Sequence, residues 1–294
     1  MSSDEPDPEH ICSPEEAFSV LGDKTRLAML LELADGADAQ KAETGLTFSQ
    51  LRRRVGVEDS GRFNYHLDKL REGFIEKSGD EYVLRFPGYA IVSAVYAGTY
   101  GGPVDEQTAE SRFDCPDCDR SLEIAYGDNQ LLFRCGEHSV VLGYPVPPGA
   151  YSGRSLSELA AVTVDRMLSN LYLTLRGTCP RCWGRIDVEY PVTSPDTQDD
   201  SRVYGRVACE RCWLEYTFLV RALVASHPAV LGFYTDHGLD PAESLIGSKA
   251  VGYAGELELD GDGTATATVE LDGERLVVEL ADDTPLVAHH RREK

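Results

Sequence analysis

The chain has 294 residues, of which 42% are hydrophobic, so it is long enough for two or three modest domains with buried cores. No apolar run approaches the length of a membrane span, and the acidic N-terminus lacks the basic-then-apolar pattern of a secretion signal. These features argue against a membrane or secreted protein and predict a cytoplasmic one. The 50 acidic and 28 basic residues give a net charge of -22, which taken alone argues against a nucleic-acid partner.

The acidic excess has a particular composition and is unevenly spread. Only six of the basic residues are lysines, and an acid-rich, lysine-poor surface is typical of extreme halophiles, where net charge reflects adaptation to salt. Between Thr47 and Lys77 there are seven basic and five acidic residues, so this window carries 7 − 5 = +2. In molar salt the Debye length is about 3 Å, so the acidic remainder would be screened from DNA. The charge is therefore compatible with DNA binding, although it does not support it.

Composition and turn signals divide the chain into four segments of an α+β protein. We expect a disordered acidic tail at 1–12 and a helix-rich segment with a short hairpin at 13–100. All the paired cysteines fall in 101–222, and helices followed by an antiparallel β-meander are expected in 223–294. The polar stretch 193–201 has no apolar residue and should form an exposed, mobile loop.

The segment after the tail predicts helices with clear start and stop signals. Capping residues precede the first three helices, apolar residues recur at helical spacing, and Gly56 separates the third helix from the fourth. The expected elements are helices beginning after Ser13 and Asp23, helices over 48–55 and 60–71, and strands over 74–77 and 81–86. Helix, turn, helix and hairpin is the order of a winged helix-turn-helix, and a generic small α+β domain is the alternative.

Three stretches of this segment carry a family resemblance: LGDKTRLAMLLEL, FSQLRRRVGV and GRFNYHLDKLREGFIEKSGDEYVL. They resemble the ArsR-type winged-helix repressors over about 75 residues, and most of all the two-part haloarchaeal regulators with a separate C-terminal domain. The resemblance implies a DNA-binding transcription regulator whose recognition helix contains the Phe63–Leu67 motif. Metal-sensing members carry a Cys-x-Cys pair in the preceding helix, but 48–55 has no cysteine. Any signal is therefore expected to come from the cysteine-bearing body.

Helical geometry sorts the predicted recognition helix into a buried and an outward face. Phe63, Leu67 and Leu70 form the apolar stripe, which leaves polar residues outward for duplex DNA. Arg62 suits a guanine edge, Asn64 an adenine edge, and Tyr65 a thymine methyl or a phosphate. Residues expected to hold the backbone are Arg52, Arg53, Arg54, Lys69 and Lys77. For each single Arg or Lys, a solvated surface charge is the alternative, and His66 is interpreted as structural.

Seven of the eight cysteines, with one histidine, fall into two sets with metal-ligand spacing. The first set is Cys115, Cys118, Cys135 and His138; the second is Cys179, Cys182, Cys209 and Cys212. Each set is two knuckles separated by a sequence that can form a hairpin, which is zinc-ribbon spacing. We predict two structural zinc ions, because four protein ligands leave no open coordination position. Disulfides and a thioredoxin-like site are the disfavoured alternatives, and Cys12 is left as a spare thiol.

The remainder of the body gives weaker signals. An amphipathic helix over 155–175 would most simply pack the two ribbons together, with dimerisation or a ligand pocket as alternatives. Trp183 and Trp213 each follow the second cysteine of a knuckle, and we expect them to pack over the metal site rather than stack on a base. Alternating residues and Asp-Gly turns between 256 and 287 predict a three-stranded meander.

These observations favour a transcription regulator with a DNA-binding head and a zinc-stabilised sensor or interaction body. A homodimer is expected, because one winged helix reads only half of a palindromic site. No Walker loop, GxSxG, HExxH, or Cys/His pair outside the metal sets occurs, so we predict no enzymatic activity. The alternatives are a protein-interaction module of the transcription machinery and a zinc- or redox-responsive switch, the latter at the set that contains His138.

Overall fold

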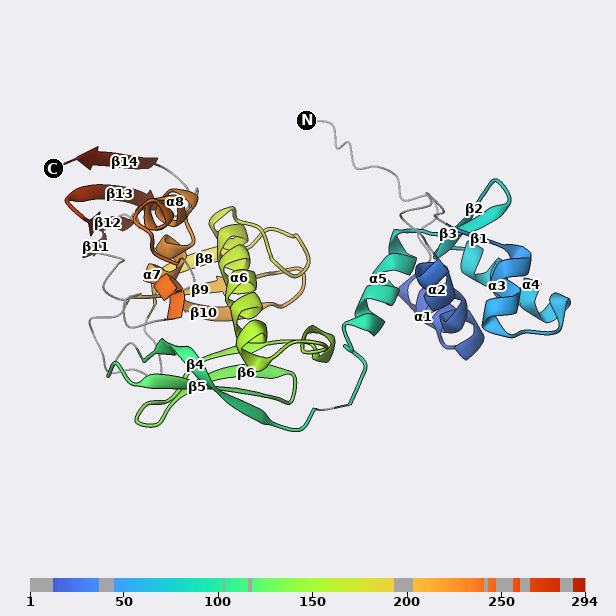
Figure 1. Ribbon diagram of the computed structural model, residues 1–294. Coiled ribbons are helices and arrows are strands. Elements are labelled where there is room, and N and C mark those ends of the chain that lie inside the picture. The colour runs from blue at the N-terminus through green and yellow to red at the C-terminus, as the bar shows by residue number, and fades with distance from the viewer. Residues whose placement is uncertain are drawn as a thin grey trace, which may run out of the picture. The chain divides into compact units, whose positions relative to one another are not determined.

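The computed structural model describes residues 13–36, 45–102, 104–115, 118–192, 203–240, 243–246, 256–259, 265–280 and 288–293. The predicted tail at 1–12, with Cys12, and the polar loop at 193–201 lie outside these ranges. The fold is α+β with several small antiparallel sheets, as the sequence predicts (Figure 1). The chain divides into two compact units, 1–102 and 103–294, and each is described by itself. None of the described helices is long and apolar enough to span a bilayer.

The N-terminal unit consists of helices and one small sheet. Its elements are α1 (Pro14–Leu21), α2 (Lys24–Gly36), β1 (Leu46–Thr47), α3 (Phe48–Val55), α4 (Ser60–Arg71), β2 (Ile75–Ser78), β3 (Glu81–Leu84) and α5 (Phe86–Tyr96). The strands are antiparallel in the order β1-β3-β2, and β2 and β3 form a hairpin directly after α4. The sequence analysis extended the second strand to residue 86, but the chain turns into α5 at Phe86. Helix α5 is apolar with a Pro and a Gly in its first turn, so its pattern gave no clear helical period.

Capping side chains set the ends of these helices where the sequence analysis placed them. Ser13 and Thr47 each form a capping box, accepting from the backbone N–H three residues on. Asp59 caps α4 by accepting from the backbone N–H of Arg62 at 2.9 Å. Gly56 ends α3 with φ of 74°, a left-handed conformation that glycine adopts without strain. The α3–α4 connection is therefore a tight, locally encoded turn.

The apolar stripes of α2, α3 and α4 meet in one core. Its fully buried members include Met29, Leu30, Leu33, Leu51, Phe63, Leu67 and Leu70. The Phe48 and Phe63 rings pack edge to face with centroids 5.0 Å apart, so this contact joins α3 to α4. His66 is also buried, with its Nδ1 3.6 Å from Asp23 Oδ1, which confirms its interpretation as a structural residue. The opposite side of α4 remains exposed.

The C-terminal unit begins with two sheets joined by a long helix. A four-stranded sheet in the order β4-β5-β6-β7 is followed by α6, and then by a three-stranded sheet in the order β10-β9-β8. The elements are β4 (Gln107–Asp114), β5 (Ser121–Gly127), β6 (Gln130–Cys135), β7 (Ser139–Pro145), a 3-10 turn (Pro148–Ala150), α6 (Leu156–Leu175), β8 (Asp187–Val192), β9 (Tyr204–Ala208) and β10 (Glu215–Leu219). All neighbouring strands are antiparallel.

Helix α6 packs with both sheets, as its amphipathic sequence predicts (Figure 1). Leu159 and Val164 in its N-terminal half belong to the core of the four-stranded sheet, whereas Leu171 and Leu175 belong to the core that contains the three-stranded sheet. Two polar contacts repeat this division. Asn170 donates to the Tyr144 hydroxyl on β7, and Thr174 Oγ1 lies 2.5 Å from the Tyr216 hydroxyl on β10. Helix α6 therefore contributes side chains to two hydrophobic cores.

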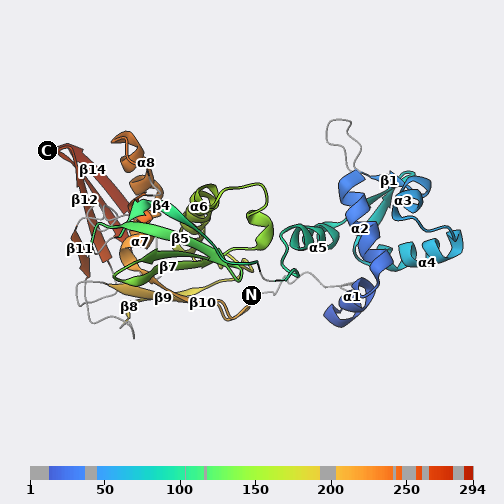
Figure 2. The same ribbon diagram turned by 60° about the horizontal axis from the view of Figure 1, so that its bottom comes forward.

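The end of the chain forms short helices and a last sheet. These elements are α7 (Val220–Ala225), α8 (Pro228–Asp236), α9 (Glu243–Ile246), β11 (Glu256–Leu259), β12 (Ala265–Leu271), β13 (Glu274–Leu280) and β14 (Ala288–Glu293). The strands form an antiparallel meander in chain order (Figure 2). The sequence analysis was wrong about its size, because it predicted three strands and the sheet has four. The segment 288–293 does not alternate apolar and polar residues, so it lacks the signal that marked the other strands.

Candidate metal centres and candidate DNA-contacting surface

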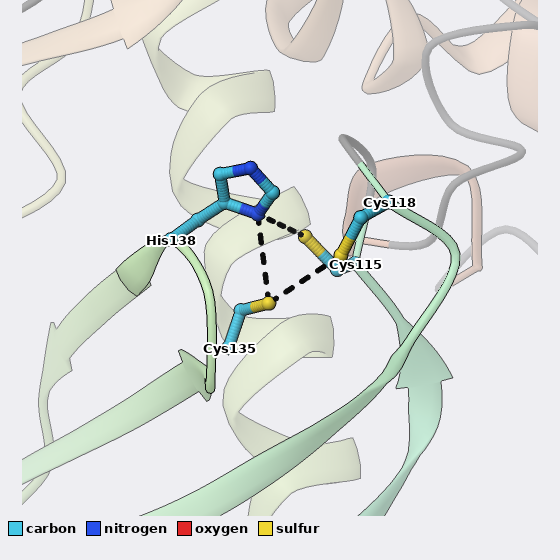
Figure 3. Close-up of side chains that lie close together, drawn as sticks. All are labelled: Cys115, Cys118, Cys135 and His138. Atoms are coloured by element: carbon cyan, nitrogen blue, oxygen red, sulfur yellow. Dashed lines mark hydrogen bonds between the residues drawn. The ribbon is translucent and has the colours of Figure 1, made fainter.

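The four-stranded sheet holds the first cysteine set. Cys115 follows β4, Cys118 precedes β5, Cys135 ends β6, and His138 precedes β7. Figure 3 shows the three sulfur atoms and the imidazole converging on one point. Cys115 Sγ lies 3.5 Å from His138 Nδ1, and Cys135 Sγ lies 3.6 Å from both His138 Nδ1 and Cys118 Sγ. The antiparallel pairing thus brings together ligands that are 23 residues apart in the chain.

The three-stranded sheet holds the second set in the same way. Cys179 and Cys182 precede β8, whereas Cys209 and Cys212 lie in the connection from β9 to β10. The Cys179–Cys212 and Cys182–Cys209 sulfur pairs are each 3.6 Å apart. In both sets all four donor atoms lie within 4.8 Å of one another. The structure therefore brings together all eight residues that the sequence analysis selected as metal ligands.

The spacing of these atoms fits a tetrahedral metal ion. With metal–sulfur bonds of about 2.3 Å, the corners of a tetrahedron are about 3.8 Å apart, close to the sulfur separations in both sets. A disulfide would require about 2.05 Å between sulfur atoms. All seven cysteines of the two sets are free thiols. The clusters are positioned to bind one metal ion each.

The cysteine thiols of the two sets differ in how easily they ionise. Backbone N–H groups of Glu137 and His138 lower the pKa of the Cys135 thiol to about 6, and those of Cys212 and Arg211 lower the pKa of Cys209 to about 7. Burial raises the pKa of Cys115 to about 12, and loss of solvation does the same for Cys212. Cys135 and Cys209 therefore ionise more easily than Cys115 and Cys212. A bound divalent cation would stabilise all of them as thiolates.

The three Cys-x-x-Cys knuckles share one backbone conformation. In each, the carbonyl of the first cysteine accepts, at 3.0 Å, from the N–H of the residue that follows the second cysteine. That residue has a positive φ in every case: 55° for Asp119, 63° for Trp183 and 57° for Trp213. The side chain at this position is exposed in all three knuckles.

The expectation that the two tryptophans pack over the metal site is wrong. Trp183 is 83% exposed and Trp213 is 87% exposed. The sequence showed that the two positions are equivalent, but it did not show that the knuckle holds this residue in the left-handed region. Spacing alone cannot distinguish a side chain that folds over the metal from one that projects into solvent.

In the N-terminal unit, the structure places the predicted DNA-contacting residues on α3, α4 and β2. Arg62, Asn64 and Tyr65 are exposed on α4 beside the buried Phe63, and Lys77 is exposed on the β2–β3 hairpin. Arg53 and Arg54 are exposed at the end of α3, whereas Arg52 and Lys69 are half-buried.

Several of these side chains already have partners. The Asn64 amide donates to Asp68 Oδ2 at 2.8 Å, Lys69 Nζ lies 2.8 Å from Glu72 Oε1, and Arg54 lies 3.6 Å from Glu32. The hydrogen bond that Lys69 donates to Glu72 raises the pKa of Lys69. Among the described residues, Arg52, Arg53, Arg62 and Lys77 make no ion pair; Arg52 is half-buried and the other three are exposed. The three exposed cations are available without breaking an ion pair.

Comparison with known proteins finds family matches for both units. Residues 112–286, more than half of the chain, match a family described as a domain of unknown function (DUF7351). Residues 14–95 match a second family described as a domain of unknown function (DUF7347). No curated protein and no solved structure matches the chain.

Proposed function

We propose that this chain, which belongs to the family described as domain of unknown function DUF7351, is a DNA-binding transcription regulator. Its N-terminal unit would read duplex DNA as a winged helix-turn-helix. Helix α3, the turn at Gly56, helix α4 and the β2–β3 hairpin follow one another in the order of that motif. The C-terminal unit would act as a metal-stabilised sensor or interaction body.

The division of α4 into two faces is the observation that carries this proposal. Phe63, Leu67 and Leu70 are fully buried, whereas Arg62 and Tyr65 at the start of the helix are exposed. A recognition helix needs this arrangement, because its N-terminal residues must reach base edges while its other side is anchored to the domain. The local excess of basic residues between positions 47 and 77 supports the same surface.

The individual contacts follow from geometry and chemistry. Arg62 has an exposed guanidinium suited to the two acceptors of a guanine edge, and Asp59 holds the helix start that positions it. Asn64 would have to exchange its bond with Asp68 for an adenine edge. Arg53 on α3 and Lys77 on the hairpin would contact phosphates on either side.

Zinc is the metal that we assign to the two clusters. Sulfur-rich tetrahedral sets of three cysteines with one histidine, or of four cysteines, are typical of structural zinc. Four protein ligands leave no position for water or substrate, so the ions would hold the strand ends together and would not catalyse a reaction. This role is consistent with ligands that lie at the ends of β4, β6 and β9.

A homodimer is part of the proposal, because a palindromic operator needs two reading heads. Helix α5 offers a surface for such contacts. Its Phe86, Tyr89 and Tyr96 side chains are exposed, and Phe18 on α1 is exposed as well. Exposed aromatic residues of this kind are typical of association surfaces.

The deciding experiment maps binding sites of the purified full-length protein at high salt and measures zinc in the same sample. The proposal expects discrete sites with two-fold symmetry and two zinc ions per chain. In cells, a diffuse chromatin signal that follows the polymerase would instead favour a protein-interaction module. Absence of DNA binding from the fully metallated protein would contradict the proposal.

Substitution of Arg62 tests the recognition face. We expect Arg62→Ala to weaken binding to the mapped operator about 5- to 150-fold, which corresponds to about 1–3 kcal/mol for a lost bidentate base contact. Lys69→Ala is the matched control: Lys69 lies on the same helix but is paired with Glu72, so its loss should weaken binding less and equally across sequences. Binding would be measured by fluorescence anisotropy on operator and scrambled duplexes. Equal affinity of wild type and Arg62→Ala would contradict the assignment of α4.

A further inference from the structure

Packing within the C-terminal unit does not explain the presence of its two tryptophans. They are the only tryptophans in the chain, and both are almost fully exposed. Each follows directly on a ligand of the same four-cysteine cluster, Cys182 or Cys212, and the donor atoms of that cluster lie within 4.8 Å of one another. Two large aromatic side chains therefore project from one small region of the surface.

Local structure gives no reason for tryptophan at either position. A φ near 60° is unfavourable for a bulky residue, and glycine, asparagine or aspartate adopts it at lower cost. The equivalent position of the first cluster is occupied by Asp119, which shows that the knuckle forms without an aromatic residue. Neither backbone conformation nor core packing accounts for tryptophan at these two positions. A ligand that contacts the rings would account for it.

The stretches that contain the rings are slightly basic, in contrast to the chain as a whole. Residues 176–187 contain three arginines and one acidic residue, Asp187, and residues 209–215 contain Arg211, Glu210 and Glu215, so together they carry 4 − 3 = +1. Arg211 lies beside the knuckle that contains Cys179 and Cys182. Its Cδ is only 3.3 Å from the point where a Cβ on Gly184 would lie. Arg181, Arg185 and Arg211 are exposed and make no ion pair with any described residue. Flat aromatic faces and uncommitted guanidinium groups thus occur together.

We propose that Trp183 and Trp213, with Arg181, Arg185 and Arg211, form a surface that binds single-stranded nucleic acid. The indole rings would stack on unpaired bases, and the guanidinium groups would contact phosphates. Base faces are covered by their neighbours inside a duplex, so this surface would favour single strands over duplex DNA. This inference concerns the C-terminal unit and does not depend on operator reading by α4.

A protein partner fits this surface less well. The core of a protein interface is a contiguous apolar area from which water is excluded. Among the described residues of this unit, the other large hydrophobic side chains that are exposed are Val162 and Tyr172, which lie on α6. The tryptophans are instead bordered by arginines, and stacking on bases needs only the ring faces and nearby cations.

Intrinsic fluorescence gives a direct test, because every tryptophan of the chain lies in this surface. The full-length, metal-loaded protein would be titrated with single-stranded DNA and RNA of about 12 nucleotides, a length within the range of known stacking sites. We expect saturable quenching by one or both single strands and much weaker quenching by a duplex of equal length. Comparison of the two single strands identifies the preferred type. Absence of quenching at micromolar concentrations, or equal quenching by the duplex, would overturn the proposal.

Variants then assign the binding energy, with anisotropy of a labelled oligonucleotide as the readout. Trp183→Ala and Trp213→Ala should each weaken binding about 5- to 150-fold, the range expected for loss of one stacked base. Tyr172→Ala removes an exposed aromatic residue on α6 and should leave affinity unchanged. Unaltered circular dichroism and zinc content would verify that each variant is folded.

Two further results would contradict the proposal. The first is wild-type affinity for single strands in both tryptophan variants. The second is protection of the tryptophans from a soluble quencher by a purified protein partner, with none by oligonucleotides. That second outcome would assign the surface to protein docking.

Discussion

Removal of the metal ions is expected to unfold residues 103–294 while residues 1–102 keep their structure. With metal bound, the eight clustered residues would fix the strand ends of two small sheets, and both sheets pack against α6. Structural zinc supplies about 10–16 kcal/mol in small zinc domains, which is comparable to the whole stability of a typical domain, about 5–15 kcal/mol. The N-terminal unit has its own core and none of the clustered ligands, so chelation should not affect it.

Chelation followed by circular dichroism and tryptophan fluorescence would measure this effect. We expect loss of the β-sheet signal and a change in emission, because both tryptophans lie next to cysteines of the second cluster. The variant Cys179→Ser should lose one metal ion and show the same unfolding. Cys12→Ser is the matched control, since it removes a cysteine outside both clusters. A chelated protein with native spectra would show that the ions are dispensable for folding.

Truncation of Phe63 should destabilise the N-terminal unit by about 3–5 kcal/mol, the usual cost of removing a buried phenylalanine side chain. Phe63 is fully buried, and its ring packs edge to face on Phe48, so Phe63→Ala opens a cavity where α3 meets α4. Because a typical domain has only about 5–15 kcal/mol of stability, operator binding should be lost together with the fold of this unit.

Denaturant unfolding monitored by circular dichroism would check this result. Tyr65→Ala is the matched control, because Tyr65 lies two residues away on the same helix but is 58% exposed; its stability should change by no more than about 0.5 kcal/mol. Metal content should stay at the wild-type level in both variants. Equal stability of the two variants would mean that the buried and exposed faces of α4 are assigned incorrectly.

Much of this architecture could be predicted because its signals are local. Ser13, Asp23 and Thr47 mark helix starts through short-range hydrogen bonds, and the buried stripe of α4 follows from helical spacing. The two metal clusters were likewise predictable, since Cys-x-x-Cys spacing places two ligands on one turn. Antiparallel pairing then brings the second half of each set within reach.

The features that were not predicted depend on context beyond local pattern. Trp183 and Trp213 project outward because the knuckle backbone holds them at positive φ, and composition carries no sign of that conformation. Helix α5 has apolar residues on most sides, so its sequence fits a buried strand as well as a helix. Strand β14 is recognised only through its hydrogen bonds to β13.

Because α6 belongs to two hydrophobic cores, it limits where the chain can be cut into fragments or joined to another protein. A fragment that ended after α6 would expose Leu171 and Leu175, and one that began after α6 would lack part of its core. The two metal clusters are therefore not interchangeable modules that could be transplanted singly into another chain. The two clusters and α6 form one structural unit. An insertion or a deletion within the helix would both rotate and translate one sheet relative to the other.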